Sequence, residues 1–135
     1  MPVTLFLKSE GSAVSPDEAM QRLNTILAHA WMVRNFLKHA DEAQEDEEML
    51  EVHRVVFDVI RAVEPSFERR DAVEYLRRLR GKLPKLRKAA AFLQENYRRV
   101  SNHTNFEMAA RSLDGCVGHI DEVLAELGDD TAARG

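Results

Sequence analysis

The chain has 135 residues and a mass of 15.4 kDa, the size of one domain with one hydrophobic core. Hydrophobic residues make up 44% of it and charged residues 31%, a balance that excludes collagen-like, low-complexity and mostly disordered chains. The formal net charge is −4, and the single cysteine, Cys116, excludes an intramolecular disulfide and a cysteine-based zinc cluster.

The first predicted helix begins at Pro16, after an extended N-terminal segment over residues 1–14. Ser15 offers a hydroxyl to cap the free amides, proline suits the first helical position, and Glu18 can bond back to the cap. The helix is expected to end near Ala40. Its inward face is marked by residues that recur every three or four positions: Met20, Leu23, Leu27, Ala30, Trp31, Arg34 and Leu37.

Two further apolar patterns follow, separated by Pro65. The first predicts a helix from about Glu45 to Val63, because the residue directly before a proline is driven out of the α region. The second predicts a long helix from about Ser66 to Val100. Its apolar spacings alternate between four and three, as in a heptad seam, at Ala72, Leu76, Leu79, Leu83, Leu86, Ala90, Leu93 and Tyr97.

The long helix contains Gly81 and Pro84 within one turn. A proline inside a helix removes a backbone hydrogen bond and its ring clashes with the preceding turn. We therefore expect the helix to be kinked, or split into two helices, between Gly81 and Pro84.

A capping box that opens at Thr104 and closes at Glu107 starts the last predicted helix, over about Asn105 to Leu127. Gly128 ends it, since glycine is the usual residue just past a helix. Residues 129–135 are expected to form a flexible C-terminal tail.

Four amphipathic helices with short connections predict an all-α fold. Neighbours in sequence then pack as neighbours in space, which gives an antiparallel four-helix up-down bundle. Residues 15–128 form its single domain. The sequence contains no glycine-rich phosphate loop, which argues against the common nucleotide-binding folds.

Basic residues are concentrated in one part of the chain. Residues 66–103 carry 11 of the 19 Lys and Arg residues against four acids, whereas an acidic run occupies residues 41–48. Such charges are typical of solvated faces, and a pI near 5.7 with few aromatic side chains favours that interpretation. The alternative is a phosphate-binding strip for nucleic acid. Its members are Arg77, Arg78, Arg80, Lys82, Lys85, Arg87 and Lys88.

Two polar residues fall on predicted inward faces. Arg34 lies on the stripe of the first helix and His53 on that of the second, and an antiparallel register sets them in one layer. A buried guanidinium needs a partner, so we expect Arg34 to snorkel toward the acids within residues 42–46 as part of a structural polar network. The alternative is a small-ligand or metal-binding site formed by Trp31, Arg34 and His53.

A metal site is a weaker alternative. Cys116 and His119 lie one helical turn apart and can bind zinc if a third ligand joins them. None of the five histidines follows a glutamate by three positions, so the pattern of a di-iron bundle is missing. We expect no cofactor, with Cys116 as a small buried side chain.

The last predicted helix has small residues on the side opposite its apolar stripe. Ser112, Gly115 and Gly118 follow at intervals of three, and Met108 shares their side. Glycine in a helix costs roughly 0.5–1 kcal/mol relative to alanine, so two glycines here suggest that something approaches the backbone closely. The expected neighbour is a second helix, from the same chain or from a dimer mate.

A short motif resembles that of a known family. Arg34, Asn35 and His39 match the Arg-Asn-x-x-x-His motif of the HEPN family, small all-helical proteins that include many dimeric ribonucleases. Arg98 and His103 have the same Arg-to-His spacing. The resemblance covers six residues, and it implies that arginine and histidine engage a scissile RNA phosphate while the histidine assists proton transfer.

These patterns together favour a non-enzymatic interaction or scaffold protein that self-associates as a homodimer or binds a helical partner. An RNA-binding or RNA-cleaving bundle and a bundle with a polar core site are the alternatives. No apolar run approaches the roughly 18 residues of a membrane span, and the N-terminal residues lack the basic region of a signal peptide, so we expect a cytoplasmic protein.

Overall fold

The computed structural model describes residues 14–127, and this part of the chain is all-helical, as predicted. It contains no strand, only an isolated bridge between Val14 and Leu127. The expected N-terminal segment, apart from Val14, and the expected tail lie outside the described residues. The helices are α2 (Pro16–His39), α3 (Asp41–Gln44), α4 (Glu47–Glu68), α5 (Ala72–Val100) and α6 (Thr104–Ala125).

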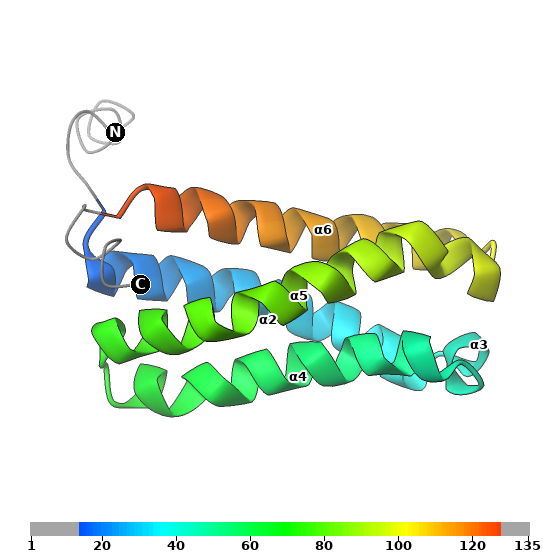
Figure 1. The fold of residues 1–135 in the computed structure, drawn as a ribbon, viewed down its shortest axis with the longest axis horizontal. Coiled ribbons are helices and arrows are strands. Elements are labelled where there is room, and N and C mark those ends of the chain that lie inside the picture. Colours follow the sequence, from blue (N-terminus) through cyan, green and yellow to red (C-terminus); the bar gives the residue numbers. More distant parts are fainter. Residues whose placement is uncertain (1–13, 128–135) are drawn as a thin grey trace.

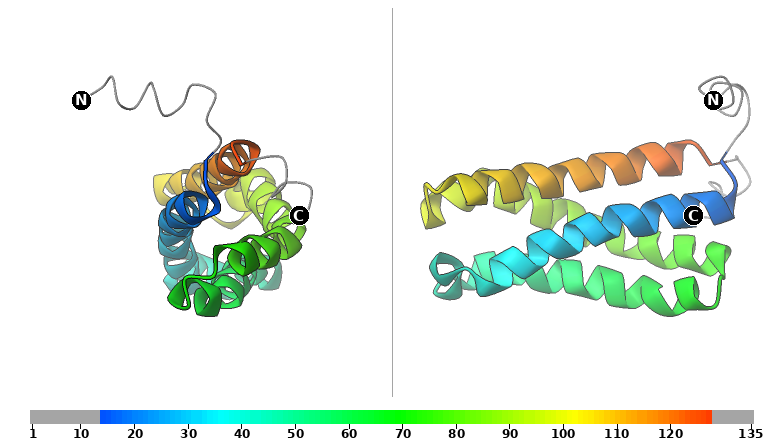
Figure 2. Two further views of the ribbon diagram at one scale, coloured as in Figure 1. Left: turned by 90° about the vertical axis from the view of Figure 1, so that its left-hand side faces the viewer. Right: turned by 180° about the vertical axis from the view of Figure 1, so that it is seen from behind.

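The four long helices lie lengthwise beside one another, and short turns join the end of each to the start of the next (Figure 1). Seen end on, they surround a common interior (Figure 2). α4 packs on α2 and α5, α6 packs on the same two helices, and α2 also touches α5. The amide of Val14 donates to the carbonyl of Glu126 at 2.8 Å and ties the entry of α2 to the end of α6.

The predicted heptad seam of α5 forms the centre of this interior. All eight of its members are buried, and the apolar stripes of α2, α4 and α6 face it. Tyr75 lies beside the seam with no exposed surface, and its hydroxyl donates to Oδ1 of Asn24 on α2 at 3.0 Å. Burial raises the pKa of this phenol well above its ordinary value. Trp31 departs from the predicted stripe of α2, since it is only half-buried.

The predicted boundary at Pro65 is wrong. α4 runs through the proline to Glu68, and residues 66–68 belong to α4 rather than to the next helix. Proline has no amide hydrogen, so the carbonyl one turn before Pro65 loses its helical hydrogen bond. Because Pro65 is exposed, this carbonyl can accept a hydrogen bond from water instead. The helix ends in a Schellman motif, in which Arg70 adopts φ 59° and the amide of Asp71 donates to the carbonyl of Ser66 at 2.9 Å.

The long helix therefore starts later than predicted, at Ala72, because Asp71 caps it by accepting from the amide of Glu74 at 3.1 Å. It continues without interruption to Val100, so the expectation of two separate helices is wrong. Pro84 is exposed, which again leaves the freed carbonyl on the water-facing side of the helix.

Two smaller differences concern the other turns. The acidic run forms the short helix α3 before Asp46 caps α4, so α4 begins at Glu47 instead of Glu45. Thr104 is the first residue of α6 rather than its cap. His103 takes that place, and its Nδ1 accepts from the amide of Asn105 at 3.0 Å.

Candidate functional site

A cluster of aromatic and cationic side chains occupies the seam between α2 and α4. Arg34 is 7% exposed, and its guanidinium carbon lies 4.3 Å from the centre of the Trp31 ring and 5.0 Å from that of Phe57. The two ring centres are 6.2 Å apart. Each cation–π contact is worth roughly 0.5–2 kcal/mol, more where the cation is desolvated. The cation of Arg34 is thus held by ring faces.

The expected ion pair between Arg34 and the acids of residues 42–46 is wrong. Within residues 14–127 no acid pairs with Arg34, and Asp46, one of the expected partners, caps Met49 and pairs with Arg99 instead. Among the described residues, Nε of Arg34 and Nδ1 of His53 are both buried without a hydrogen-bond partner. Burial lowers the pKa of His53, and the charge of Arg34 lowers it further. The two residues do share one environment, as the register predicts.

The predicted basic strip does not form one continuous surface. Arg77 and Arg78 both bind Glu74, and the hydrogen bond from Arg77 followed by that from Arg78 holds the pKa of this carboxyl at about 2, although its own burial opposes the shift. Arg87 reaches across to Asp121 of α6 at 2.7 Å. Members of the strip therefore serve contacts on different sides of α5. Arg80 and Lys82 are half-buried, and Lys85 and Lys88 border α4.

The first HEPN-like pair is not brought together. Arg34 points into the seam between α2 and α4, whereas His39 is exposed at the end of α2. Nδ1 of His39 lies 3.0 Å from the carbonyl oxygen of Asn35, which is one turn away on the same helix. The inward arginine and the outward histidine cannot engage one phosphate from these positions.

The second pair has other roles in the structure. The guanidinium carbon of Arg98 lies 5.2 Å from the ring centre of Tyr97. His103 caps α6 through Nδ1, which accepts a backbone hydrogen bond and therefore carries no proton in this arrangement.

The suggested zinc ligands point to different environments. Cys116 is 5% exposed, its Sγ lies 3.7 Å from the carbonyl oxygen of Ile26, and burial raises the pKa of the thiol. His119 is exposed, with Nδ1 3.3 Å from Glu122. Among residues 14–127, no group of three or more His, Cys, Asp and Glu side chains is placed to hold a metal ion.

The outer face of α6 lacks the expected neighbour from the same chain. Added Cβ atoms at Gly115 and Gly118 would meet nothing within 4 Å, so no helix within residues 14–127 packs against them, and for this part of the chain the expected intrachain neighbour is wrong. Ser112 is exposed, and Met108 is 42% exposed. This face, Met108, Ser112, Gly115 and Gly118, is called the outer α6 face below.

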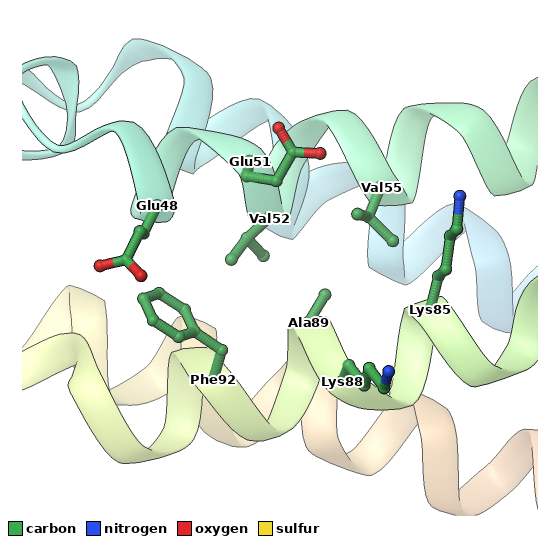
Figure 3. Close-up of a pocket in the computed structure, with 8 residues that line it drawn as sticks. All are labelled: Glu48, Glu51, Val52, Val55, Lys85, Lys88, Ala89 and Phe92. Atoms are coloured by element: carbon green, nitrogen blue, oxygen red, sulfur yellow. The ribbon is translucent and has the colours of Figure 1, made fainter.

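A groove between α4 and α5 was not anticipated as a unit. It has a volume of about 440 Å³, an apolar floor and oppositely charged rims, with acids on α4 and lysines on α5 (Figure 3). The sequence does not reveal the groove, because its two rims belong to separate patterns. Glu48 comes from the acidic run, whereas Lys85 and Lys88 come from the basic strip. Its lining residues are Glu48, Glu51, Val52, Val55, Lys85, Lys88, Ala89 and Phe92, and it is called the α4–α5 groove below.

Comparison with family models, with curated proteins and with solved structures gives no significant match for this chain. None of the helices in the described part is both long and apolar enough to cross a membrane.

Proposed function

We propose that this chain is an antiparallel four-helix up-down bundle, bent between Gly81 and Pro84, that acts as a non-enzymatic interaction protein in the cytoplasm. It self-associates as a homodimer through the outer α6 face. Short turns between consecutive helices and one buried interior support the bundle. The dispersal of the HEPN-like pairs and of the strip favours this function over cleavage of RNA.

The observation that carries the proposal is the open space at two glycines. Each glycine costs roughly 0.5–1 kcal/mol of helix stability relative to alanine. No group in the described chain approaches Gly115 or Gly118 so closely that a larger side chain would clash with it. A helix of a second copy can use this space, because small residues let two backbones approach. Met108 adds exposed apolar area beside the glycines.

Charges around the glycines are self-complementary. When α6 of a second copy crosses antiparallel, midway between Gly115 and Gly118, Arg111 of each copy lies opposite Glu122 of the other. Both side chains are 70% exposed, and within the described part of the chain each has only an intrahelical partner, Arg111 with Glu107 at 3.4 Å and Glu122 with His119 at 3.3 Å. Such exposed pairs are weak and can be exchanged for contacts across a two-fold axis.

Sedimentation equilibrium between micromolar and high-micromolar concentration tests the proposal. Gly115→Leu should give a folded monomer, whereas Gly81→Leu should leave the dimer intact, because Gly81 has equal open space on a different helix. Arg111→Glu should weaken the dimer, and adding Glu122→Arg should restore it. A wild-type protein that stays monomeric at high-micromolar concentration refutes self-association.

A second candidate function rests on the unpartnered atoms of Arg34 and His53. We propose that a small anion such as a carboxylate binds there and accepts a hydrogen bond from Nε of Arg34. Titration with acetate, followed through Trp31 fluorescence and the NMR shift of His53, tests it. No saturable change in wild type, or the same change in Arg34→Met, refutes this candidate.

A further inference from the structure

The α4–α5 groove combines an apolar floor with two rims of opposite charge (Figure 3). Val52 and Ala89 are 2% and 7% exposed and close the floor, while Val55 and Phe92 are half-buried on its walls. The small side chain of Ala89 keeps the centre of the groove open. An apolar side chain that enters here exchanges water for carbon contacts on both helices.

The rims are free to meet a partner. Within residues 14–127, neither Lys85 nor Lys88 has an ion pair. Glu51 is 61% exposed and binds Arg54 at 3.2 Å, and Glu48 is 72% exposed and lies 3.5 Å from Arg99. Exposed pairs of this kind contribute only about 0–1 kcal/mol, so both acids can turn to a partner's cations at little cost.

The size and shape of the groove fit a helix. Its lining covers eight residues along each helix, from Glu48 to Val55 and from Lys85 to Phe92, which is a rise of seven steps. At 1.5 Å per residue this is about 10 Å, or two helical turns. An amphipathic helix presents anchors at intervals of three, four and seven residues over the same length.

We propose that the α4–α5 groove binds an amphipathic helix from a different protein. The apolar edge of that helix enters the groove, its acidic flank faces Lys85 and Lys88, and its basic flank faces Glu48 and Glu51. This inference goes beyond the proposed self-association, because the groove does not include α6.

Two other occupants fit less well. A second copy of the described chain lacks a matching ridge, since its exposed large hydrophobic residues, Met32, Val73 and Met108, lie on three different helices. A nucleic acid would place its phosphates against the acidic rim, where like charges repel them. A helix with one acidic and one basic flank satisfies both rims at once.

Designed helical peptides of roughly 15 residues, two turns of which carry leucine anchors, provide the probe. Three versions share these anchors and carry one acidic and one basic flank, two acidic flanks or two basic flanks. Fluorescence anisotropy with the full-length protein should show saturable binding that is about tenfold tighter for the mixed peptide than for either of the others, a difference of about 1.4 kcal/mol. Mixed-peptide binding that is absent up to millimolar protein, or that equals binding of the other two, overturns the proposal.

Variants locate the binding site. Ala89→Leu fills the floor and should weaken the mixed peptide at least about tenfold. Ala91→Leu is the matched control, because Ala91 is an exposed alanine two residues away on the same helix, and it should bind normally. The double variant Lys85→Glu/Lys88→Glu should lose the mixed peptide and gain the peptide with two basic flanks. Equal binding to Ala89→Leu and Ala91→Leu, or no exchange of peptide preference, contradicts the assigned site.

The same titrations in the Gly115→Leu background separate the two proposals. Peptide binding should be unchanged there whether or not wild type forms a dimer, because the two surfaces lie on different helices. Binding that disappears with Gly115→Leu, in a variant that remains helical by circular dichroism, assigns the peptide to the outer α6 face and refutes the groove.

Discussion

The helical glycines Gly81, Gly115 and Gly118 allow the packing argument to be tested by single methyl groups. At each of them a Cβ would meet nothing within 4 Å, and the backbone is helical with no positive φ. Alanine therefore introduces no clash in the single chain. It reduces the conformational entropy of the unfolded state and improves helix propensity.

The expected gain in the free energy of unfolding is about 0.5–1 kcal/mol for each alanine. With an unfolding entropy near 2.1 cal/mol/K per residue, 1 kcal/mol corresponds to about 3–4 °C for a chain of this size, so each variant should melt about 2–4 °C higher. Urea unfolding at sub-micromolar protein gives the value for the single chain, free of any contribution from association.

Gly81→Ala serves as the internal reference, since it lies on α5 and away from the outer α6 face. All three variants should be stabilised at low concentration. At high concentration Gly115→Ala and Gly118→Ala should also weaken self-association, and Gly81→Ala should not. A midpoint for Gly115→Ala that is unchanged or lower than wild type at sub-micromolar protein would show that the space is filled within the chain, and the reasoning would fail.

Three further predictions concern buried or strained groups. Among the residues that the structure describes, the hydroxyl of Ser66 is buried without a hydrogen-bond partner. Ser66→Ala should therefore raise the free energy of unfolding by about 1 kcal/mol more than the exposed control Ser112→Ala, and equal effects in urea unfolding would contradict this. Arg70 has φ 59°, so Arg70→Gly should stabilise the protein by about 0.5–1 kcal/mol, whereas a lower melting temperature would exclude the left-handed conformation there. The native pKa of His53 is lowered, so the unfolded state binds more protons and stability should fall as the pH drops below about 6.5 toward that native pKa. His53→Gln should flatten this dependence in urea titrations, and an unchanged slope would refute the lowered pKa of His53.

Much of the helical pattern follows from local physics. The heptad spacing of α5 predicted all eight buried seam residues, and Ser15 caps α2 as its position before Pro16 indicates, accepting from the amide of Glu18 at 3.1 Å. The end of α4 was less accessible. Its Schellman motif uses Arg70 where glycine is usual, so the sequence lacks the strongest stop signal for a helix, and Pro65 is the only breaker near this end. Asp71, followed three residues later by Glu74, was the available sign of the next helix.

The candidate sites divide in the same way. The sequence predicted that Arg34 and His53 lie on inward faces of two helices, because helical periodicity determines which side of a helix a residue occupies. It did not predict that the rings of Trp31 and Phe57, and not an acid, hold the guanidinium of Arg34. Arg34 lies on α2 and Phe57 lies 23 positions later on α4, so their contact depends on how these two helices pack side by side.

The α4–α5 groove depends on tertiary structure throughout. Its rims come from residues more than thirty positions apart, and each rim alone is an ordinary charged helix face. Residue spacing within single helices is enough to predict the all-α class, the seam of α5 and the side of α6 on which its glycines lie. Only the packing of α4 against α5 decided that acids, lysines and an apolar floor meet in one groove, because contacts between helices depend on register and rotation that no local pattern contains.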